Sequence, residues 1–321
     1  MQESIDNNEA LSILSQNEIE ALEKEVQFHT TRQGTKLSFH EYGDPQGNPL
    51  FFYHGTGSHV HGMLLHKPGR KHGFRIIAPD RPGVAQSDFR PGWTILEYAQ
   101  NMADLADELG ISTFGAIGIS GGGPTLMASA FAIPDRLSCV VDLACAMPLY
   151  QDPEMIKHLG AMDRLYAELG SHLPLPLFEI PFSILGIMQK VMKSPKSFAK
   201  MFDSSLCPAD KELFQLPELQ YLFMRDFQEL FRHGAEGPAY DAQTVYKEWG
   251  FNLADIDIHI EVFQGTADIF IPQQFSEYLA HTAKDVRLNL IEGQGHFYHL
   301  AYGDQILKNV KDRFFQNTLI N

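Results

Sequence analysis

The sequence predicts an α/β fold: a mostly parallel, eight-stranded sheet flanked by helices, with an inserted region that is all helical. Short apolar runs alternate with helical patterns along most of the chain, which is typical of a parallel sheet built from strand–helix–strand units. Two β-rich stretches separated by Gln33-Gly34, a hairpin signal, begin the fold. Between Cys145 and Asn252 the helical patterns continue without a convincing strand.

These patterns assign each element of the sheet-forming part. The first two strands form an antiparallel pair, and the alternation that follows them predicts parallel strands. Strands are predicted at 26–30, 36–42, 50–53, 75–78, 114–119, 137–145, 258–263 and 286–291. Helices are predicted at 94–109, 122–132, 273–280 and 304–315.

Residues 147–250 form the predicted helical insertion. Asp152 is a suitable N-cap and is followed by Pro153, a favourable first helical residue. A second amphipathic helix covers about 218–231. The insertion holds seven of the eleven methionines, whose flexible thioethers suit an irregular core or an adaptable apolar pocket. The apolar face of the first helix consists of Met155, Leu159, Met162 and Tyr166.

Residues 1–25 are predicted as a polar leader, and 26–146 with 251–321 as the core. The apolar residues of the leader keep only approximate helical spacing, so we expect it to pack loosely. Its seven carboxylates and single lysine are the reverse of a signal peptide. The most apolar stretch, 173–188, is broken by three prolines and a glutamate, so it does not form a membrane span. We therefore expect a soluble, cytoplasmic protein.

The composition limits the partners. The formal net charge is −15, from 40 acidic and 25 basic side chains, and such a field repels phosphate backbones and anionic lipids. We expect a small-molecule substrate and neither nucleic acid nor membrane as a partner; a homodimer stays open. Cys139, Cys145 and Cys207 form no C-x-x-C pair and are expected to be reduced, buried thiols. No metal or cofactor is expected.

A G-x-S-x-G pattern at 118–122 places Ser120 between an apolar strand and a helix of small residues. This strand–turn–helix context gives the pattern its meaning, because a sharp turn pushes the serine hydroxyl out over the end of the sheet. Helix N-terminal amides nearby favour the negative charge that develops in acyl transfer. The alternative is a glycine-rich turn with an incidental serine.

Two further polar residues follow later strands. Asp268 ends Gly-Thr-Ala-Asp after the strand at 258–263, and His296 ends Gly-Gln-Gly-His after the strand at 286–291. Active sites gather at the carboxyl ends of parallel strands, and the order serine, aspartate, histidine is the one expected for such a fold. Taken singly, Asp268 could cap a helix and His296 could be a surface or core histidine. Together they predict a catalytic triad with Ser120.

The motif His54-Gly55-Thr56-Gly57 directly follows the strand at 50–53. Glycines there let backbone amides point into the site, so the amides of Thr56 and Gly121 are predicted to form an oxyanion hole. We expect His54 to be structural. The loop that begins with Asp80-Arg81-Pro82-Gly83 is expected to be scaffolding.

From about residue 26 to its end, the chain resembles the α/β-hydrolase superfamily. The resemblance is carried by the motifs at 54–55, 80–83, 118–122, 265–268 and 295–296, which match in order and spacing. It implies a serine hydrolase with a helical cap, here the insertion. Two positions depart from the family's pattern. Many members have glycine where this chain has Ala85. Many have a bulky residue where this chain has Gly121, and the glycine would enlarge the acyl-side pocket or leave it less structured.

The resemblance implies hydrolysis of a carboxylic ester of a small or medium, neutral or apolar substrate through an acyl-enzyme. His296, oriented by Asp268, would remove the proton of Ser120. The cap aromatics Phe178, Phe182, Phe223 and Phe227 could line an apolar pocket, although core packing is the expected role for each.

Other activities share the fold. A proline iminopeptidase would use cap carboxylates, for which Glu168, Glu218 and Glu229 are candidates. Carbon–carbon bond hydrolases and cofactor-free haloperoxidases share the triad, and some members only bind ligands. A serine nucleophile argues against the haloalkane dehalogenase and epoxide hydrolase branches, which use aspartate.

Overall fold

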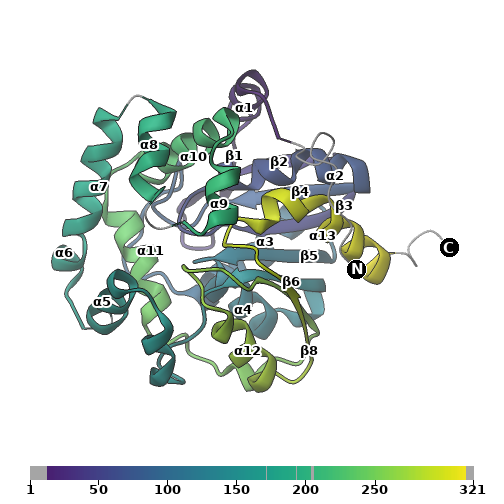
Figure 1. Cartoon of the computed structure of the whole chain (residues 1–321). Coiled ribbons are helices and arrows are strands. Elements are labelled where there is room, and N and C mark those ends of the chain that lie inside the picture. Colours follow the sequence, from purple (N-terminus) through teal and green to yellow (C-terminus); the bar gives the residue numbers. More distant parts are fainter. Residues whose placement is uncertain (1–12, 171, 193, 204–205, 316–321) are drawn as a thin grey trace.

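The computed structural model describes residues 13–170, 172–192, 194–203 and 206–315. Its centre is one eight-stranded sheet with the strand order β1-β2-β4-β3-β5-β6-β7-β8. Helices lie on both sides of the sheet, and a further group of helices gathers at one end of it (Figure 1). The strands are β1 (Gln27–Thr30), β2 (Lys36–Gly43), β3 (Asn48–Tyr53), β4 (Phe74–Pro79), β5 (Phe114–Ser120), β6 (Leu137–Cys145), β7 (Ile260–Gly265) and β8 (Val286–Ile291).

The pairing of the strands agrees with the prediction. β1 pairs with β2 and β2 with β4 in antiparallel fashion, whereas all other neighbours are parallel. All eight predicted strands are confirmed, with ends that differ by at most two residues. Because parallel strands share a direction, the loops that follow β3, β5, β7 and β8 leave the sheet at the same edge.

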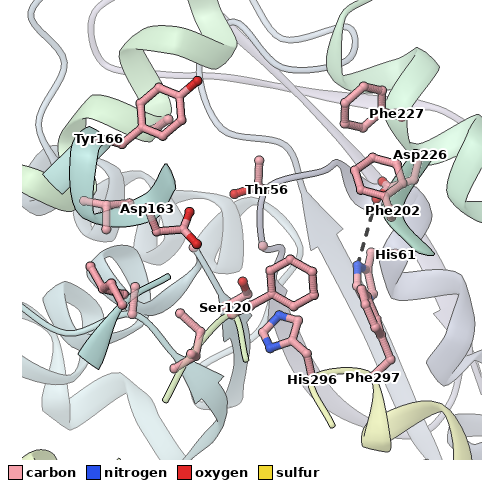
Figure 2. Close-up of a pocket in the computed structure, with 18 of the residues that line it drawn as sticks. Thr56, His61, Ser120, Asp163, Tyr166, Phe202, Asp226, Phe227, His296 and Phe297 are labelled. Atoms are coloured by element: carbon pink, nitrogen blue, oxygen red, sulfur yellow. Dashed lines mark ion pairs between the residues drawn. The ribbon is translucent and has the colours of Figure 1, made fainter. Parts of the chain in front are cut away.

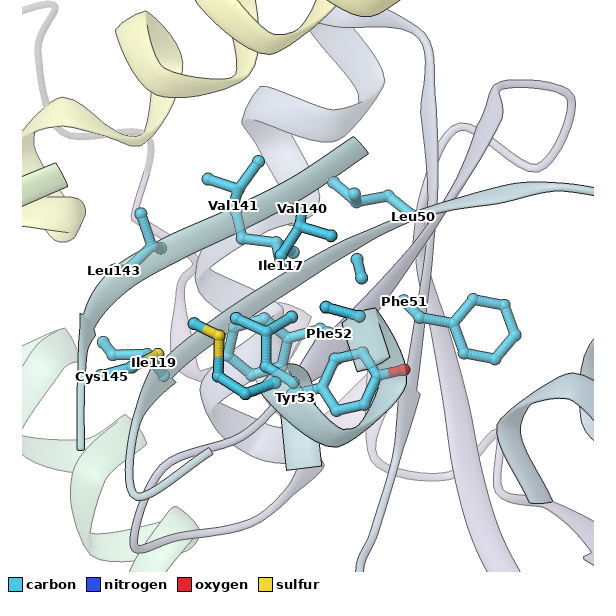
Figure 3. Close-up of a cluster of buried hydrophobic side chains, with 14 of the residues drawn as sticks. Leu50, Phe51, Phe52, Tyr53, Ile117, Ile119, Val140, Val141, Leu143 and Cys145 are labelled. Atoms are coloured by element: carbon cyan, nitrogen blue, oxygen red, sulfur yellow. The ribbon is translucent and has the colours of Figure 1, made fainter. Parts of the chain in front are cut away.

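The centre of the sheet is buried on both faces, which requires apolar and mainly β-branched side chains. Ile117 of β5 and Val140 and Val141 of β6 are fully buried, and Leu50 and Phe51 of β3 belong to the same cluster (Figure 3). β3, β5 and β6 thus lie in the hydrophobic core, and the loops at their carboxyl ends start from well-packed strands.

The helices beside the sheet match the prediction in three of four cases. α13 begins at Tyr298, six residues before its predicted start, and α2 was not predicted because 66–72 is rich in basic residues and lacks apolar periodicity. No helix in the described part of the chain is both long and apolar enough to cross a membrane. These elements are η1 (His59–Leu65), α2 (His66–His72), α3 (Ile95–Glu108), α4 (Gly123–Ala132), η2 (Pro134–Arg136), α12 (Gln273–Thr282) and α13 (Tyr298–Phe314).

Between β6 and β7, the described residues form helices and loops without a strand, as predicted. Asp152 caps its helix by accepting a hydrogen bond from the Glu154 amide. The expected continuous helix after it is wrong: a 3₁₀ helix ends at His158, and α5 starts beyond Gly160, a residue that weakens helices. The elements of this helical insertion are η3 (Pro153–His158), α5 (Ala161–Gly170), α6 (Leu175–Phe178), α7 (Ile180–Val191), α8 (Pro195–Phe202), α9 (Pro208–Leu213), α10 (Pro217–Leu230), α11 (Glu236–Tyr246) and η5 (Leu253–Asp255).

The described part of the predicted leader does not pack loosely, which corrects that expectation. α1 (Gln16–Leu22) begins with a capping box in which Ser15 and Glu18 bond each other's backbone amides. Ile19 is fully buried, and Glu23 forms a two-bond ion pair with Arg225 of α10. The buried side chains of Leu14 and Ile19, together with these polar contacts, thus compensate for a weak apolar face. Residues 1–12 of the leader lie outside the described residues.

Candidate active site

Ser120 ends β5 in a strained conformation, with a φ of 53° that is rare for a residue other than glycine. The next residues are Gly121 and Gly122, and α4 starts at Gly123. A Cβ atom on Gly122 would lie 2.3 Å from the Tyr53 carbonyl oxygen, so no side chain fits there. The glycine-rich turn therefore brings the backbone of the serine turn close to the end of β3, as the sharp strand–turn–helix pattern predicts.

His296 and Asp268 form a buried hydrogen-bonded pair, with 2.7 Å between His296 Nδ1 and Asp268 Oδ2. The side chain of Asp268 is fully buried, and its other oxygen accepts the amides of Phe270 and Ile271 at 2.8 and 2.9 Å. These bonds fix the carboxylate, which in turn fixes the imidazole so that its Nε2 is available. The two residues that were predicted to work together are thus in direct contact.

The charges around His296 favour its protonated form. Burial acts to lower the pKa of His296, but the carboxylates of Asp268, Asp210 and Asp163 outweigh burial and raise the pKa above its ordinary value. An imidazole with a raised pKa is a stronger base. It is therefore suited to accept a proton from a neighbouring hydroxyl.

Ser120, His296, Thr56 and Gly121 line one cavity of about 410 Å³. Figure 2 shows the His296 ring beside Ser120, with Thr56 on the other side of the serine. Within the described residues, no hydrogen bond joins the Ser120 hydroxyl to the imidazole, and such contacts often tighten only when substrate binds. The structure therefore brings the predicted serine, histidine and aspartate to one place, with Asp268 behind the imidazole.

The predicted oxyanion loop lies against the serine turn. A Cβ atom on Gly121 would be 3.4 Å from the Thr56 amide nitrogen and 3.1 Å from its hydroxyl. A Cβ atom on Gly55 would be 3.0 Å from that of Ser120. The loop that carries Thr56 therefore lies directly beside the turn that carries Ser120 and Gly121.

His54 is a structural residue, as expected. It is fully buried, Nδ1 bonds the Gly55 carbonyl at 2.9 Å, and Nε2 accepts the Arg81 amide at 3.2 Å. Burial, followed by the Arg81 charge, holds the pKa of His54 well below its ordinary value. Because both ring nitrogens are occupied and the ring is neutral, His54 fixes the loop and does not act as a base.

The aromatic residues named from the sequence do line the cavity. Phe178, Phe182, Phe223 and Phe227 all contribute to its wall, together with Phe198 and Phe202 of α8. Most of these rings also pack against one another, so they both fill the insertion and surround the cavity. The lining is therefore apolar over most of its area, with the candidate catalytic groups at one end.

Three acidic residues of the insertion near this site were missed from the sequence. Asp163 and Asp226 line the cavity, and Asp210 accepts the backbone amide of His296 at 3.0 Å. The sequence contains no signal that separates them from the other acidic residues on these helices. The glutamates named as amine-binding candidates do not line the cavity: Glu168 is exposed, Glu218 is half-buried, and Glu229 pairs with Arg232.

One group of the described residues could supply three metal ligands, namely His40, His59 and Asp80. The Asp80 carboxylate is already used, because it accepts hydrogen bonds from Ser38 and from both the amide and the ring of His59. The rings of His40 and His59 are stacked with centroids 3.7 Å apart. The group is outside the cavity lining and fits a structural hydrogen-bond network better than a metal site.

The loop after β4 explains the first departure from the family's pattern. Ala85 has a φ of 48°, a left-handed conformation in which glycine is the unstrained residue. Val84, next to it, and Ala85 are buried against Leu230 and Phe231 of the insertion. The methyl group of Ala85 thus adds apolar contact at a position where the backbone is strained.

Comparisons with known proteins agree with this fold. The model of the α/β-hydrolase fold family matches residues 48–301, and the chain belongs to that family. A "non-heme chloroperoxidase" of Streptomyces lividans is 34% identical over 254 residues, which are 76% of this chain and 82% of the relative. The solved structures described next are less than 25% identical to this chain, so they show the fold alone.

Two solved structures illustrate that likeness. A thermophilic esterase from Thermogutta terrifontis has a TM-score of 0.62 and 20% identity, and the match covers 90% of this chain and 97% of the esterase. The enol-lactonase from Burkholderia xenovorans LB400 has a TM-score of 0.63 and 18% identity, with 89% and 98% of the two chains covered. These two structures share the fold, and membership of the α/β-hydrolase fold family supports a hydrolase.

Proposed function

We propose that the protein is a serine hydrolase that cleaves carboxylic esters of small or medium, neutral or apolar substrates through an acyl-enzyme. The observation that carries this proposal is the shared cavity: Ser120 and His296 line it, Asp268 holds the imidazole at 2.7 Å, and the Thr56 amide lies beside Gly121. These contacts support acyl transfer with the roles predicted for each group.

In the proposed mechanism, His296 removes the proton from Ser120 as the serine oxygen attacks the ester carbonyl. Asp268 stabilises the imidazolium that forms, and the amides of Thr56 and Gly121 bind the oxyanion. The imidazolium then gives its proton to the alcohol that leaves. Water, activated by the same histidine, releases the acid from Ser120.

The cavity supports the proposed substrate class. Its volume of about 410 Å³ and its aromatic walls suit an apolar group of modest size. The insertion supplies most of these walls, so we assign it the role of the predicted cap over residues 147–250. Asp163 and Asp226 are exceptions to the apolar lining.

The experiment is a panel of p-nitrophenyl esters of increasing acyl length, together with an aminoacyl arylamide. The proposal predicts ester turnover that is lost in Ser120→Ala and His296→Ala, and strongly reduced in Asp268→Asn. Turnover of the arylamide alone would favour an iminopeptidase. If the folded protein turned over no member of the panel, a ligand-binding role would replace the enzyme proposal.

The similarity to a chloroperoxidase favours one second candidate, halogenation with hydrogen peroxide. In that reaction hydrogen peroxide, in place of water, attacks the acyl-enzyme, so that a peracid leaves and Ser120 regains its proton through His296. The peracid then oxidises halide. Halogenation of a diketone that requires hydrogen peroxide, a carboxylic acid and Ser120 together would establish this activity, whereas independence from Ser120 would exclude it.

A further inference from the structure

Two buried aspartates of the insertion hold the two loops that carry the proposed chemistry. Asp210 of α9 is fully buried, and its two oxygens accept the backbone amides of His296 and Phe297, each at 3.0 Å. Asp226 of α10 is buried as well, and its Oδ1 accepts both the amide and the hydroxyl of Ser58 at 2.7 Å. One aspartate thus contacts the histidine loop and the other contacts the oxyanion loop.

Both core loops have a glycine opposite the aspartate that contacts them. A Cβ atom on Gly295 would lie 2.1 Å from Asp210 Oδ2, and one on Gly57 would lie 2.2 Å from Asp226 Oδ2. Neither distance is compatible with a side chain. The three heavy atoms nearest the Gly57 position all belong to Asp226. Glycines of the two predicted catalytic motifs therefore leave space for carboxylates from another part of the chain.

The backbone groups involved are close to the proposed reaction. Asp210 holds the amide of His296 itself, and Asp226 holds Ser58, two residues after Thr56. Neither aspartate bonds a side chain of the proposed triad. Each acts on the position of a loop, and a displacement of about 1 Å in such a loop can cost a hundredfold in rate.

We propose that Asp210 and Asp226 are positioning residues through which the helical insertion holds the histidine loop and the oxyanion loop in their reactive geometry. This inference rests on the proposed serine-hydrolase function. It assigns the insertion a second role besides forming the wall of the cavity: the core loops reach their working positions only when the insertion is docked on them.

The two carboxylates respond differently to replacement by the amide of asparagine. Oδ1 of Asp226 makes both bonds to Ser58, and burial raises the pKa of Asp226 to about 7 although Ser58 opposes this effect. An asparagine keeps the accepting oxygen and resembles the protonated acid. Asp210 uses both oxygens on backbone amides, so in Asp210→Asn one amide would face a nitrogen that cannot accept its hydrogen.

The first test is a double-mutant cycle on Gly57 and Asp226. Alone, Gly57→Ala and Asp226→Ala should each lower kcat for a short-chain ester by about tenfold to a hundredfold, with a smaller change in KM. In a protein that already carries Asp226→Ala, the methyl group of Ala at position 57 has space. Gly57→Ala should therefore lower kcat by less than about twofold in that protein. Asp226→Asn should recover most of the activity.

The matched control is Glu229→Gln, which removes a carboxylate of similar burial from the same helix. Glu229 pairs with Arg225 and Arg232 and contacts neither loop, so its replacement should leave kcat within about twofold. All rates are divided by the fraction of sites that react with a fluorophosphonate, so that unfolded protein does not count as a catalytic defect.

The second test is the pH profile of Asp210→Asn. Charged and titratable groups face His296 from its neighbours: Asp268 of the β7–α12 loop, Asp163 of α5, Asp210 of α9, and the neutral His61 of η1 and His299 of α13. Removing one of three carboxylates should move the acid limb of kcat/KM to lower pH. Misplacement of the loop should also lower the plateau of kcat about tenfold.

The inference would be overturned if Gly57→Ala lowered kcat equally with and without Asp226→Ala, and if Asp210→Asn left the plateau of kcat unchanged. A simple loss of thermal stability with normal kcat per labelled site would do the same. These results differ from failure of the proposed function, because in that case the unmodified protein would show no labelling at Ser120.

Discussion

Arg81 and Asp241 form a buried, two-bond ion pair between the loop after β4 and α11, with distances of 2.5 Å from Nε and 2.8 Å from Nη2. The same guanidinium donates to the carbonyl oxygens of His54 and Gly55, the residues just before Thr56. Arg81 was expected to be scaffolding, and its scaffolding role is to connect the insertion with the oxyanion loop. All its polar contacts are shielded from water.

Asp241→Asn should destabilise the protein by about 3–5 kcal/mol, because it leaves the buried guanidinium without its opposite charge. Urea unfolding measures this change. Glu154→Gln is the control, since it breaks an exposed pair with Lys157 and should change stability by less than about 1 kcal/mol. A cost below about 1 kcal/mol for Asp241→Asn would show that the ion pair does not hold the loop.

Asp163→Asn should shift the pH dependence of activity. The reaction needs neutral His296, so activity falls as the pH drops through the pKa of this histidine, which Asp163 helps to raise. Without the Asp163 charge the pKa falls, and the acid limb of kcat/KM should move to lower pH. A rate profile from pH 5 to 9 measures the limb. A limb that stays in place, or moves to higher pH, would contradict the assigned electrostatics.

Asp142→Asn should stabilise the protein increasingly as the pH rises from about 4 to about 7. Burial raises the pKa of Asp142 to about 7 from an ordinary value of 3.8, and its Oδ2 has no partner among the described residues. The folded state therefore holds a proton that the unfolded chain releases, and this stabilising contribution, complete below pH 4, is lost as the pH rises to 7.

Thermal unfolding at pH 5 and pH 8 checks this prediction. The advantage of Asp142→Asn in Tm should be larger at pH 8 by about 3 °C or more. Replacement of the exposed Asp135 by asparagine should show no such dependence on pH. An advantage that is larger at pH 5 would have the wrong sign and would refute the account.

Phe202→Ala should widen the range of acyl groups that fit. Phe202 lines the cavity and packs against Phe198 and Phe227, so its removal leaves space inside the aromatic wall. The ratio of kcat/KM for an octanoate to that for an acetate ester should rise about tenfold. Phe28→Ala, on the outer strand β1, should leave the ratio unchanged. An unchanged ratio in Phe202→Ala would place the acyl group elsewhere.

The sequence predicted the sheet because its information is local. Runs such as 114–119 and 137–145 are apolar throughout, and the turn after Ser120 needs glycine at fixed positions. The three candidate catalytic residues followed from their places after strands. Their closeness in space follows because the carboxyl ends of parallel strands lie at the same edge of the sheet.

The insertion was less predictable because its contacts join distant parts of the chain. Asp210 and Asp226 meet residues 86 and 168 positions away, and no periodicity marks them. The clearest signal was indirect: Gly57 and Gly295 stand in the core motifs, and a Cβ atom on either would collide with the carboxylate opposite it. The packing of α1 was missed for the same reason, since its partner is α10.

The most direct test of the central claim is reaction of the folded protein with a fluorophosphonate, followed by peptide mass spectrometry. The account predicts one covalent adduct on Ser120, abolished in Ser120→Ala and slowed by at least about a hundredfold in His296→Ala. A well-folded protein that forms no adduct, or an adduct that persists in Ser120→Ala, would contradict the assignment of Ser120 as the nucleophile.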